Sequence, residues 1–236
     1  DDGATWTRVA SGVTTSLAAV AGNGSLVVAA GAKGTFLRST DGGLTFAGVD
    51  TGVATDWTQI AVAGDAVAAI GMTRDSPGGD LVVSSDGGAT FRARHFDREV
   101  PVGVGFVEGA LLVAFTYGDD TRIARSRDGG KTFTDVWRSH GRALHSMTVS
   151  DTGFVLASGK TFGQVQLTFA PPSYAEATDF AIRSTDGGRT FALDASAHAS
   201  TYFARGDIVV SSEYDISRDE GRTWGHLFDA KGMLPS

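Results

Sequence analysis

The segment Ser184-Thr185-Asp186-Gly187-Gly188-Arg189-Thr190-Phe191 carries the pattern that decides the fold, because the chain repeats it. Three further copies of this S-x-D-G-G-x-T-F motif occur, a fourth has the variant form SRDEGRTW at residues 217–224, and a truncated copy, DDGATW, opens the sequence. The first aspartates of the six copies are Asp1, Asp41, Asp86, Asp128, Asp186 and Asp219. They are separated by 33 to 58 residues, which is the spacing of four-stranded propeller blades.

The residue types in the motif predict a hairpin turn between two strands. The short oxygens of Asp and Ser accept hydrogen bonds from nearby backbone N–H groups, and Gly-Gly supplies the positive φ angles of a tight turn. The aromatic residue at the end of each copy begins the outgoing strand and can bury about 150–250 Å². These aromatic residues are Trp6, Phe46, Phe91, Phe133, Phe191 and Trp224. We therefore expect the six aspartates to be structural turn residues rather than ligands.

The motif resembles the Asp-box, or BNR repeat, of sialidase-like β-propellers. Residues 31–46, GAKGTFLRSTDGGLTF, also resemble a blade of the photosystem-assembly-factor propellers, which bind partner proteins during complex assembly. The resemblance implies an all-β propeller whose boxes lie on the rim away from the ligand face. It does not specify an activity, since one fold hosts many functions.

The Gly- and Asp-rich turns between the predicted strands divide the chain into blades. We expect a single domain over residues 1–236, with an orphan strand in residues 1–12 followed by five complete four-stranded antiparallel blades. The blades are predicted at residues 14–49, 57–95, 102–137, 144–194 and 202–228. Propellers typically close with whole blades. The orphan strand therefore predicts a six- or seven-bladed ring completed by sequence outside residues 1–236, and a five-bladed ring with a spare edge strand is the alternative.

Composition excludes several classes of function. The chain has no cysteine, which excludes thiol catalysis and cysteine-ligated metals. Its net charge of −7 argues against nucleic-acid partners, which require a basic face. No apolar run reaches the length of about 18 residues that a membrane span needs. Phosphate-loop, nucleophile-elbow and zinc-helix motifs are missing from the sequence, so we expect no cofactor and no metal.

Candidate binding residues lie on the face opposite the motif turns, in loops between second and third strands and between blades. The loop candidates in the third blade are Tyr117, Asp119, Asp120 and Arg122, with Asp80, Glu213, Tyr214 and Asp215 in similar loops of other blades. The loops between blades add His95, Arg98, Arg138, His140, Arg142 and His145. Converging arginines can clamp a carboxylate with two parallel hydrogen bonds, whereas solvated rim charges are the alternative reading.

An insertion at residues 161–179 explains the longest spacing between motif copies. It contains Phe169, Tyr174 and Glu176 beside two prolines. Loops longer than about 12–15 residues without structure of their own are usually functional or disordered. We expect either a lid or partner-binding arm, or a neutral extension of the hairpin.

No complete catalytic set can be assigned. The Arg-Ile-Pro of sialidases is missing, and its nearest counterpart is Arg122-Ile123-Ala124. We therefore expect a non-catalytic periplasmic or extracellular module that binds another protein or a glycan, or that assembles a complex. The predicted partner-binding residues are Arg98, Tyr117, Asp119, Asp120, Arg122, His140, Arg142, Phe169, Tyr174 and Glu176. The alternative is a sialidase-like glycoside hydrolase acting on an acidic or neutral glycan; glycosidases of other kinds need two carboxylates about 5–9.5 Å apart.

Overall fold

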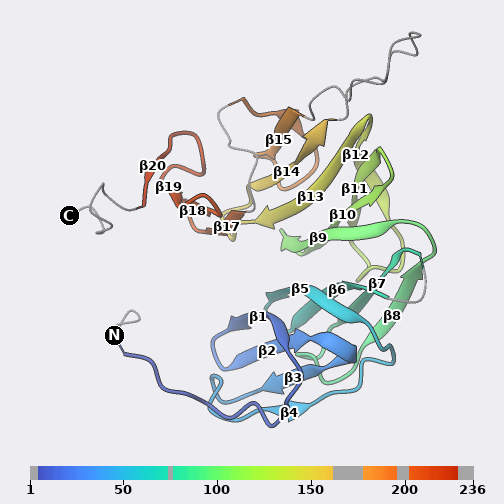
Figure 1. The fold of residues 1–236 in the computed structure, drawn as a ribbon, viewed down its shortest axis with the longest axis vertical. Helices are drawn as coiled ribbons and strands as arrows, with labels where there is room; N and C mark the ends of the chain where they lie inside the picture. The colour runs from blue at the N-terminus through green and yellow to red at the C-terminus, as the bar shows by residue number, and fades with distance from the viewer. Residues whose placement is uncertain (1–4, 74–76, 162–177, 196–201, 228–236) are drawn as a thin grey trace, which may run out of the picture. The chain divides into compact units, whose positions relative to one another are not determined.

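The computed structural model describes residues 5–73, 77–161, 178–195 and 202–227, and these residues form five four-stranded antiparallel sheets (Figure 1). In each sheet the strands lie side by side in chain order, so that every connection within a sheet is a hairpin. These sheets are the blades of a β-propeller, which confirms the predicted all-β fold. The chain divides into two compact units, residues 1–97 and 98–236, and each is described separately below.

The first unit contains blades I and II. The strands of blade I are β1 (Leu17–Asn23), β2 (Leu26–Gly31), β3 (Phe36–Ser39) and β4 (Ala47–Gly48), with a short 3-10 turn, η1, at Ala32–Gly34. The strands of blade II are β5 (Asp56–Ala63), β6 (Ala66–Met72), β7 (Gly79–Ser84) and β8 (Arg92–Phe96). The orphan strand predicted for residues 1–12 is not formed in residues 5–12, and Trp6 is 90% exposed instead of buried. Asp1 lies outside the described residues.

The second unit contains blades III, IV and V. The strands of blade III are β9 (Val100–Val107), β10 (Ala110–Tyr117), β11 (Asp120–Ser126) and β12 (Thr134–His140). The strands of blade IV are β13 (Arg142–Val149), β14 (Val155–Thr161), β15 (Thr178–Ser184) and β16 (Ala192–Leu193). The strands of blade V are β17 (Tyr202–Arg205), β18 (Ile208–Ser211), β19 (Asp215–Ser217) and β20 (Gly225–His226). None of the described residues forms a helix long and apolar enough to cross a membrane.

The core of each unit is built from the second strands of the blades. Strands β6, β10 and β14 are apolar runs buried on both faces, as the sequence predicts. In the first unit, residues of β2 and β6 pack around Trp57 and Phe36, whose rings meet edge to face at 6.1 Å. In blade V the prediction was wrong for Ile208, which is 38% exposed, and only Val209 of that strand joins the apolar cluster.

The five complete copies of the motif form the same turn between the third and fourth strands. In the copy at Ser39, the hydroxyl donates to Asp41 Oδ1 (2.7 Å) and accepts from the N–H of Gly43 (2.9 Å). Asp41 in turn accepts from the N–H of Thr45 (2.9 Å) and from its hydroxyl (2.5 Å). The other copies repeat these bonds around Asp86, Asp128, Asp186 and Asp219. The aspartates of the complete copies are therefore turn residues, as predicted.

A glycine at the end of the second strand allows the first strand to bulge towards it. Gly31, Gly71 and Gly159 lie opposite a register shift in their blades' first strands. A Cβ at any of them would overlap the backbone of that strand, at Ser16, Asp56 and Ala143 respectively. Blade III has the same register shift but carries Phe115 at this place, opposite Pro101. Blade III therefore differs from these three blades at this position, where it has the large side chain of Phe115 in place of a glycine.

The turn aspartates make a prediction about acid stability. Hydrogen bonds from Thr45 and Ser39 lower the pKa of Asp41, and similar bonds lower the pKa of the other four. A lowered folded-state pKa gives stability that is present above the ordinary pKa of about 3.9 and is lost as the pH falls further. We expect Asp41→Ala to lower the Tm at pH 7 by roughly 2–8 °C, as for loss of one capping side chain. When thermal unfolding is measured from pH 7 to pH 2, the Tm of Asp41→Ala should fall less on acidification than the Tm of the parent chain. The Tm of the control Asp65→Ala should fall with pH as steeply as that of the parent.

The bulge glycines make a second prediction. Gly31 has an extended backbone (φ −171°), so Gly31→Ala is opposed by the close approach of β1 and not by its dihedral angles. We expect a Tm lower by roughly 4–10 °C, because overpacked sites are destabilising and β1 must shift. Gly48→Ala is the control, since a Cβ there has no atom within 4 Å. Equal Tm values for the two variants, measured by calorimetry, would contradict this account of the bulge.

Candidate functional site

A cavity of about 490 Å³ lies in blade III at the ends of the strands remote from the motif turn. Its lining combines aromatic, basic and acidic side chains from three neighbouring strands. The lining residues are Arg98, Glu99, Phe115, Thr116, Tyr117, Asp120, Thr121, Arg122, Arg138, Ser139 and His140. The structure therefore brings together five of the ten predicted binding residues: Arg98, Tyr117, Asp120, Arg122 and His140.

The strand register explains why these residues meet. Tyr117 pairs with Asp120, and Asp120 pairs with His140, which gives one row across β10, β11 and β12. The neighbouring row on the same face is Phe115, Arg122 and Arg138. Residues two apart on a strand share a face. Phe115 stands where blades I, II and IV have glycine, and it lines the cavity together with Arg122.

Arg122 is held entirely by its own blade. Its Nε and Nη2 donate to the two oxygens of Glu99 (2.5 and 2.7 Å), and its Nη1 donates to Asp135 (2.7 Å). The guanidinium also lies 4.3 Å above the centre of the Phe115 ring. Burial opposes its charge, but Glu99 and Asp135 outweigh burial and the pKa of Arg122 is raised. Arg122 is therefore part of the cavity wall, with its guanidinium already engaged by Glu99 and Asp135.

The same network fixes a second arginine. Asp135 also accepts from Nε of Arg138 (2.5 Å). Burial would raise the pKa of Asp135, but its two arginine partners lower it overall. Glu99, Arg122, Asp135 and Arg138 consequently form one chain of paired charges, in which only Arg138 is largely exposed.

Asp119, Asp120 and His140 form an exposed cluster at the edge of the cavity. His140 Nδ1 lies 2.8 Å from Asp120 Oδ1, and His140 Nε2 lies 3.4 Å from Asp119 Oδ2. The hydrogen bond to Asp120 and the charges of both aspartates raise the pKa of His140. One donor atom of each residue lies within 4.8 Å of the others, a spacing that can hold a metal ion. In the structure both ring nitrogens of His140 face aspartate oxygens, which is the geometry of a charge-paired histidine.

The aspartate–histidine pair recurs in two other blades, which the sequence analysis missed. Asp80 pairs with His95 across β7 and β8 (2.7 Å), and Asp215 pairs with His226 across β19 and β20 (2.8 Å). Asp80 is 4% exposed and also accepts from Thr55 and Thr73. Burial would raise its pKa, but these hydrogen bonds lower it overall. The detectable signal was an aspartate at the start of the third strand with a histidine at the end of the fourth.

Two further predicted residues, Asp119 and Arg142, are described but do not line the cavity. Asp119 adjoins it through His140, and its carbonyl accepts from the N–H of Arg142 (3.0 Å). The guanidinium of Arg142 lies over the Phe180 ring of blade IV (5.2 Å). Phe169, Tyr174 and Glu176 lie outside the described residues.

No protein-family model matches the sequence, and no curated protein matches it. Among solved structures, YCF48 from Cyanidioschyzon merolae is similar with 14% identity and a TM-score of 0.54, over 99% of this chain and 91% of that one. A chain of the Nidogen/Laminin complex is similar with 13% identity and a TM-score of 0.60, over 93% and 82%. The GH74 enzyme of Niastella koreensis has 18% identity and a TM-score of 0.56, and the match covers 88% of this chain but only 37% of the enzyme. These similarities show the propeller fold.

The repeated aspartate–histidine pairs make a third prediction. Asp80→Asn should lower the Tm by roughly 4–10 °C at pH 7, because a buried carboxylate with three partners is lost. Since the pKa of Asp80 is lowered in the folded state, this difference should be full above about pH 4 and should shrink at lower pH. Asp120→Asn is the matched control, because the same pair is exposed there and should contribute almost nothing to the Tm. Thermal unfolding of both variants at several pH values tests the contrast.

Proposed function

We propose that this chain is a non-catalytic Asp-box propeller module that binds another protein, and that the blade III cavity receives a segment of that partner. The observation that carries the proposal is the state of the acids around the cavity. Glu99 and Asp135 are tied to Arg122, and Asp120 is tied to His140. What remains for a ligand is the exposed ring of Tyr117 and the exposed Arg98, with Arg138 exposed beside its partner Asp135.

The pairing of these acids supports binding over hydrolysis. A glycosidase needs one carboxylic acid kept protonated by apolar surroundings and a second carboxylate across the bond. Asp119 and Asp120 are more than half exposed, so they lack apolar walls. Glu99 accepts two hydrogen bonds from one guanidinium and is fixed in the wall.

The lining of the cavity fits a peptide. Tyrosine and arginine are enriched among residues that contribute most to protein interfaces. Tyr117 is 50% exposed beside the cavity, whereas Phe115 is buried beneath the guanidinium of Arg122. The volume suits one or two inserted side chains rather than an extended polymer.

The solved relatives support the same class of function. One similar structure is YCF48 bound to D1 peptide, with 14% identity and a TM-score of 0.51 over 93% of this chain. Another similar chain belongs to the complex of nidogen and laminin. We propose accordingly that residues 1–236 belong to one periplasmic or extracellular propeller that acts in recognition or complex assembly. The alternative is a glycoside hydrolase, for which the GH74 likeness and the Asp119–Asp120 pair are the supporting observations.

The test uses a photo-crosslinking amino acid at position 117 of the full chain in its native host. The captured partner is identified, purified and measured against the parent chain and against Tyr117→Ala by calorimetry. We expect Tyr117→Ala to weaken binding at least about tenfold, the loss typical of an interface hot spot. Phe203→Ala is the matched control, because this blade V ring is 68% exposed and should not contribute.

Equal affinities for parent and Tyr117→Ala would refute the assignment of this surface. Release of reducing sugar from a glycan by the parent chain, with loss of that release in Asp119→Asn, would favour the hydrolase instead.

A further inference from the structure

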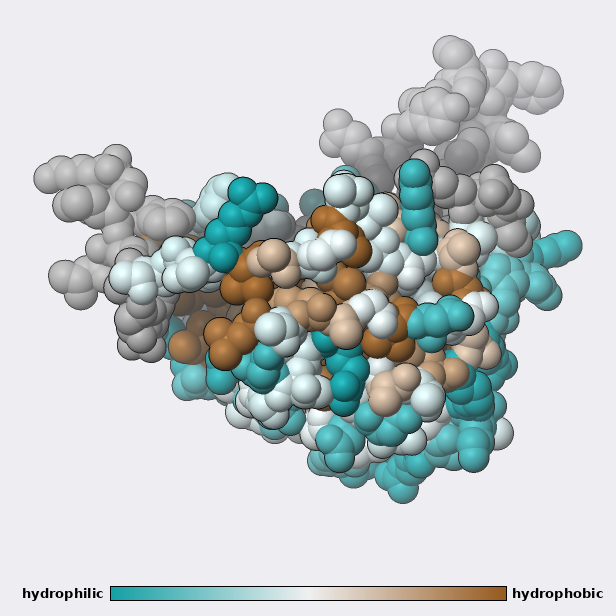
Figure 2. Space-filling model, turned by 90° about the horizontal axis from the view of Figure 1, so that it is seen from below, coloured by the Kyte–Doolittle hydropathy of each residue, from teal (hydrophilic) through white to brown (hydrophobic). Residues whose placement is uncertain are grey.

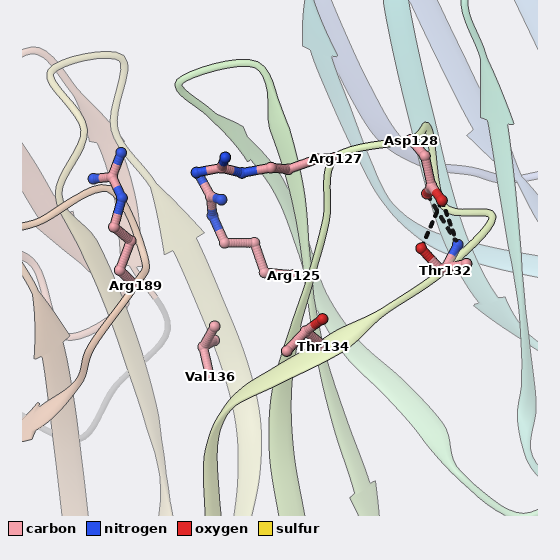
Figure 3. A pocket seen from close by; sticks show the side chains of 7 residues that line it. All are labelled: Arg125, Arg127, Asp128, Thr132, Thr134, Val136 and Arg189. Atoms are coloured by element: carbon pink, nitrogen blue, oxygen red, sulfur yellow. Dashed lines mark hydrogen bonds between the residues drawn. The ribbon is translucent and has the colours of Figure 1, made fainter.

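A second cavity, of about 400 Å³, lies between blades III and IV beside the motif turns. Arg125 and Arg127 extend into it from the end of β11, and Arg189 extends into it from the blade IV turn (Figure 3). Thr134 and Val136 of β12 form its floor. Because Asp120 and Ser126 are the two ends of β11, this cavity and the blade III cavity lie at opposite ends of one strand.

Arg125 is the unusual member of this group. The residue is 8% exposed, and its Nε is buried without a hydrogen-bond partner among the described residues. Arginine is always charged in proteins, and a buried charge is costly unless it is paired. Burial lowers the pKa of Arg125, and the neighbouring Arg127 and Arg189 lower it further.

The same position in other blades shows what the arginine ordinarily does. Arg38 and Arg183 also precede the motif serine by one residue. Arg38 Nε donates to the carbonyl of Gly87 in the turn of blade II (2.6 Å). Arg183 donates to the carbonyls of Glu220 and Gly221 (2.8 Å for Gly221) in the turn of blade V. In these two cases the arginine of one blade binds the turn of the next blade, whereas Arg125 makes no such bond to the described turn of blade IV.

The acids near the cavity are already engaged. Glu108 forms an ion pair with Arg189, which also donates to the carbonyl of Asp186. The carboxylates of Asp128 and Asp186 accept the internal hydrogen bonds of their own turns, and Figure 3 shows those of Asp128 with Thr132. Glu108 and Asp186 offset part of the positive charge at Arg125 from a distance. Three guanidinium groups therefore face one space in which Glu108 is paired with Arg189 and the carboxylates of Asp128 and Asp186 are engaged by their own turns.

We propose that this cavity binds an oxyanion, a carboxylate, phosphate or sulfate group, which links Arg125 and Arg127 of blade III to Arg189 of blade IV. Guanidinium forks match these anions geometrically and are more weakly hydrated than ammonium groups. The anion takes the place of the turn carbonyl that Arg38 and Arg183 bind in their blades. The site is separate from the partner-binding cavity and does not depend on it.

The test is thermal unfolding of the full chain titrated with inorganic phosphate at constant ionic strength, with sodium chloride as the balancing salt. We expect a saturable rise in Tm for the parent, of roughly 5–10 °C at a hundredfold excess over Kd. Arg125→Met should abolish the saturable rise. It should also unfold at or above the parent Tm without phosphate, because an unpaired buried charge is removed.

Arg38→Met is the matched control at the same position of blade I. It loses an existing hydrogen bond to Gly87, so we expect a lower Tm but an unchanged response to phosphate. A response to phosphate that persists in Arg125→Met, or that is missing in the parent for every anion tried, would overturn the proposal.

Two further titrations identify the source of the anion. Acetate reports on free carboxylates, and a capped peptide containing glutamate is compared with its glutamine counterpart. Arg125-dependent binding of phosphate or acetate alone supports a free ion. Binding of the glutamate peptide but not of the glutamine peptide supports an acidic side chain supplied by another chain. Failure of all of these probes refutes the site and leaves the binding role of Tyr117 unaffected.

Discussion

The hydrogen bonds around the motif aspartate are the constraint on which each blade depends. One carboxylate accepts backbone and side-chain donors from the residues that follow it, and the serine hydroxyl closes the ring from the other side. This fixes the angle at which the fourth strand leaves the third. Because the bonds lie within one short segment, the turn forms without help from distant residues, and it can be repeated along the chain with little change in sequence.

The repeated geometry also makes the exceptions visible. Three blades place glycine where the first strand bulges, and blade III places Phe115 there. Two blades use an arginine to bind the neighbouring turn, and Arg125 of blade III does not. Both exceptions lie in blade III. Phe115 pairs with Arg122 near the start of β11, Arg125 lies near the end of β11, and a cavity lies beside each of them. The apolar residues that reach the surface on the face drawn in Figure 2 (brown) lie among hydrophilic ones (teal), so exposed apolar area alone does not single out a site.

Much of the fold follows from the sequence because its determinants are local. The motif predicts the turn, and Gly-bounded apolar runs such as Val67 to Ile70 predict buried second strands. The site residues are less accessible to this reasoning. Proximity of Arg98, Tyr117 and His140 was predicted from their shared loop face, but the capture of Arg122 by Glu99 and Asp135 depends on strand register and on the Phe115 ring. The strand predicted in residues 1–12 is not formed in residues 5–12.

Blade V shows how the type of contact between two neighbouring blades determines how easily one of them opens. Its strands have two to four residues each, and the apolar cluster that it shares with blade IV has four buried members among the described residues, Phe154, Leu156, Tyr202 and Val209. Much of its contact with blade IV is polar: Ser150 donates to the carbonyl of Gly206 (2.6 Å), Asp151 accepts from the N–H of Gly206 (2.6 Å), and Arg183 donates to two carbonyls. Segments with few buried apolar contacts open at low free-energy cost. Hydrogen bonds are directional, however. After opening, blade V can therefore re-form its hydrogen bonds with blade IV in only one register.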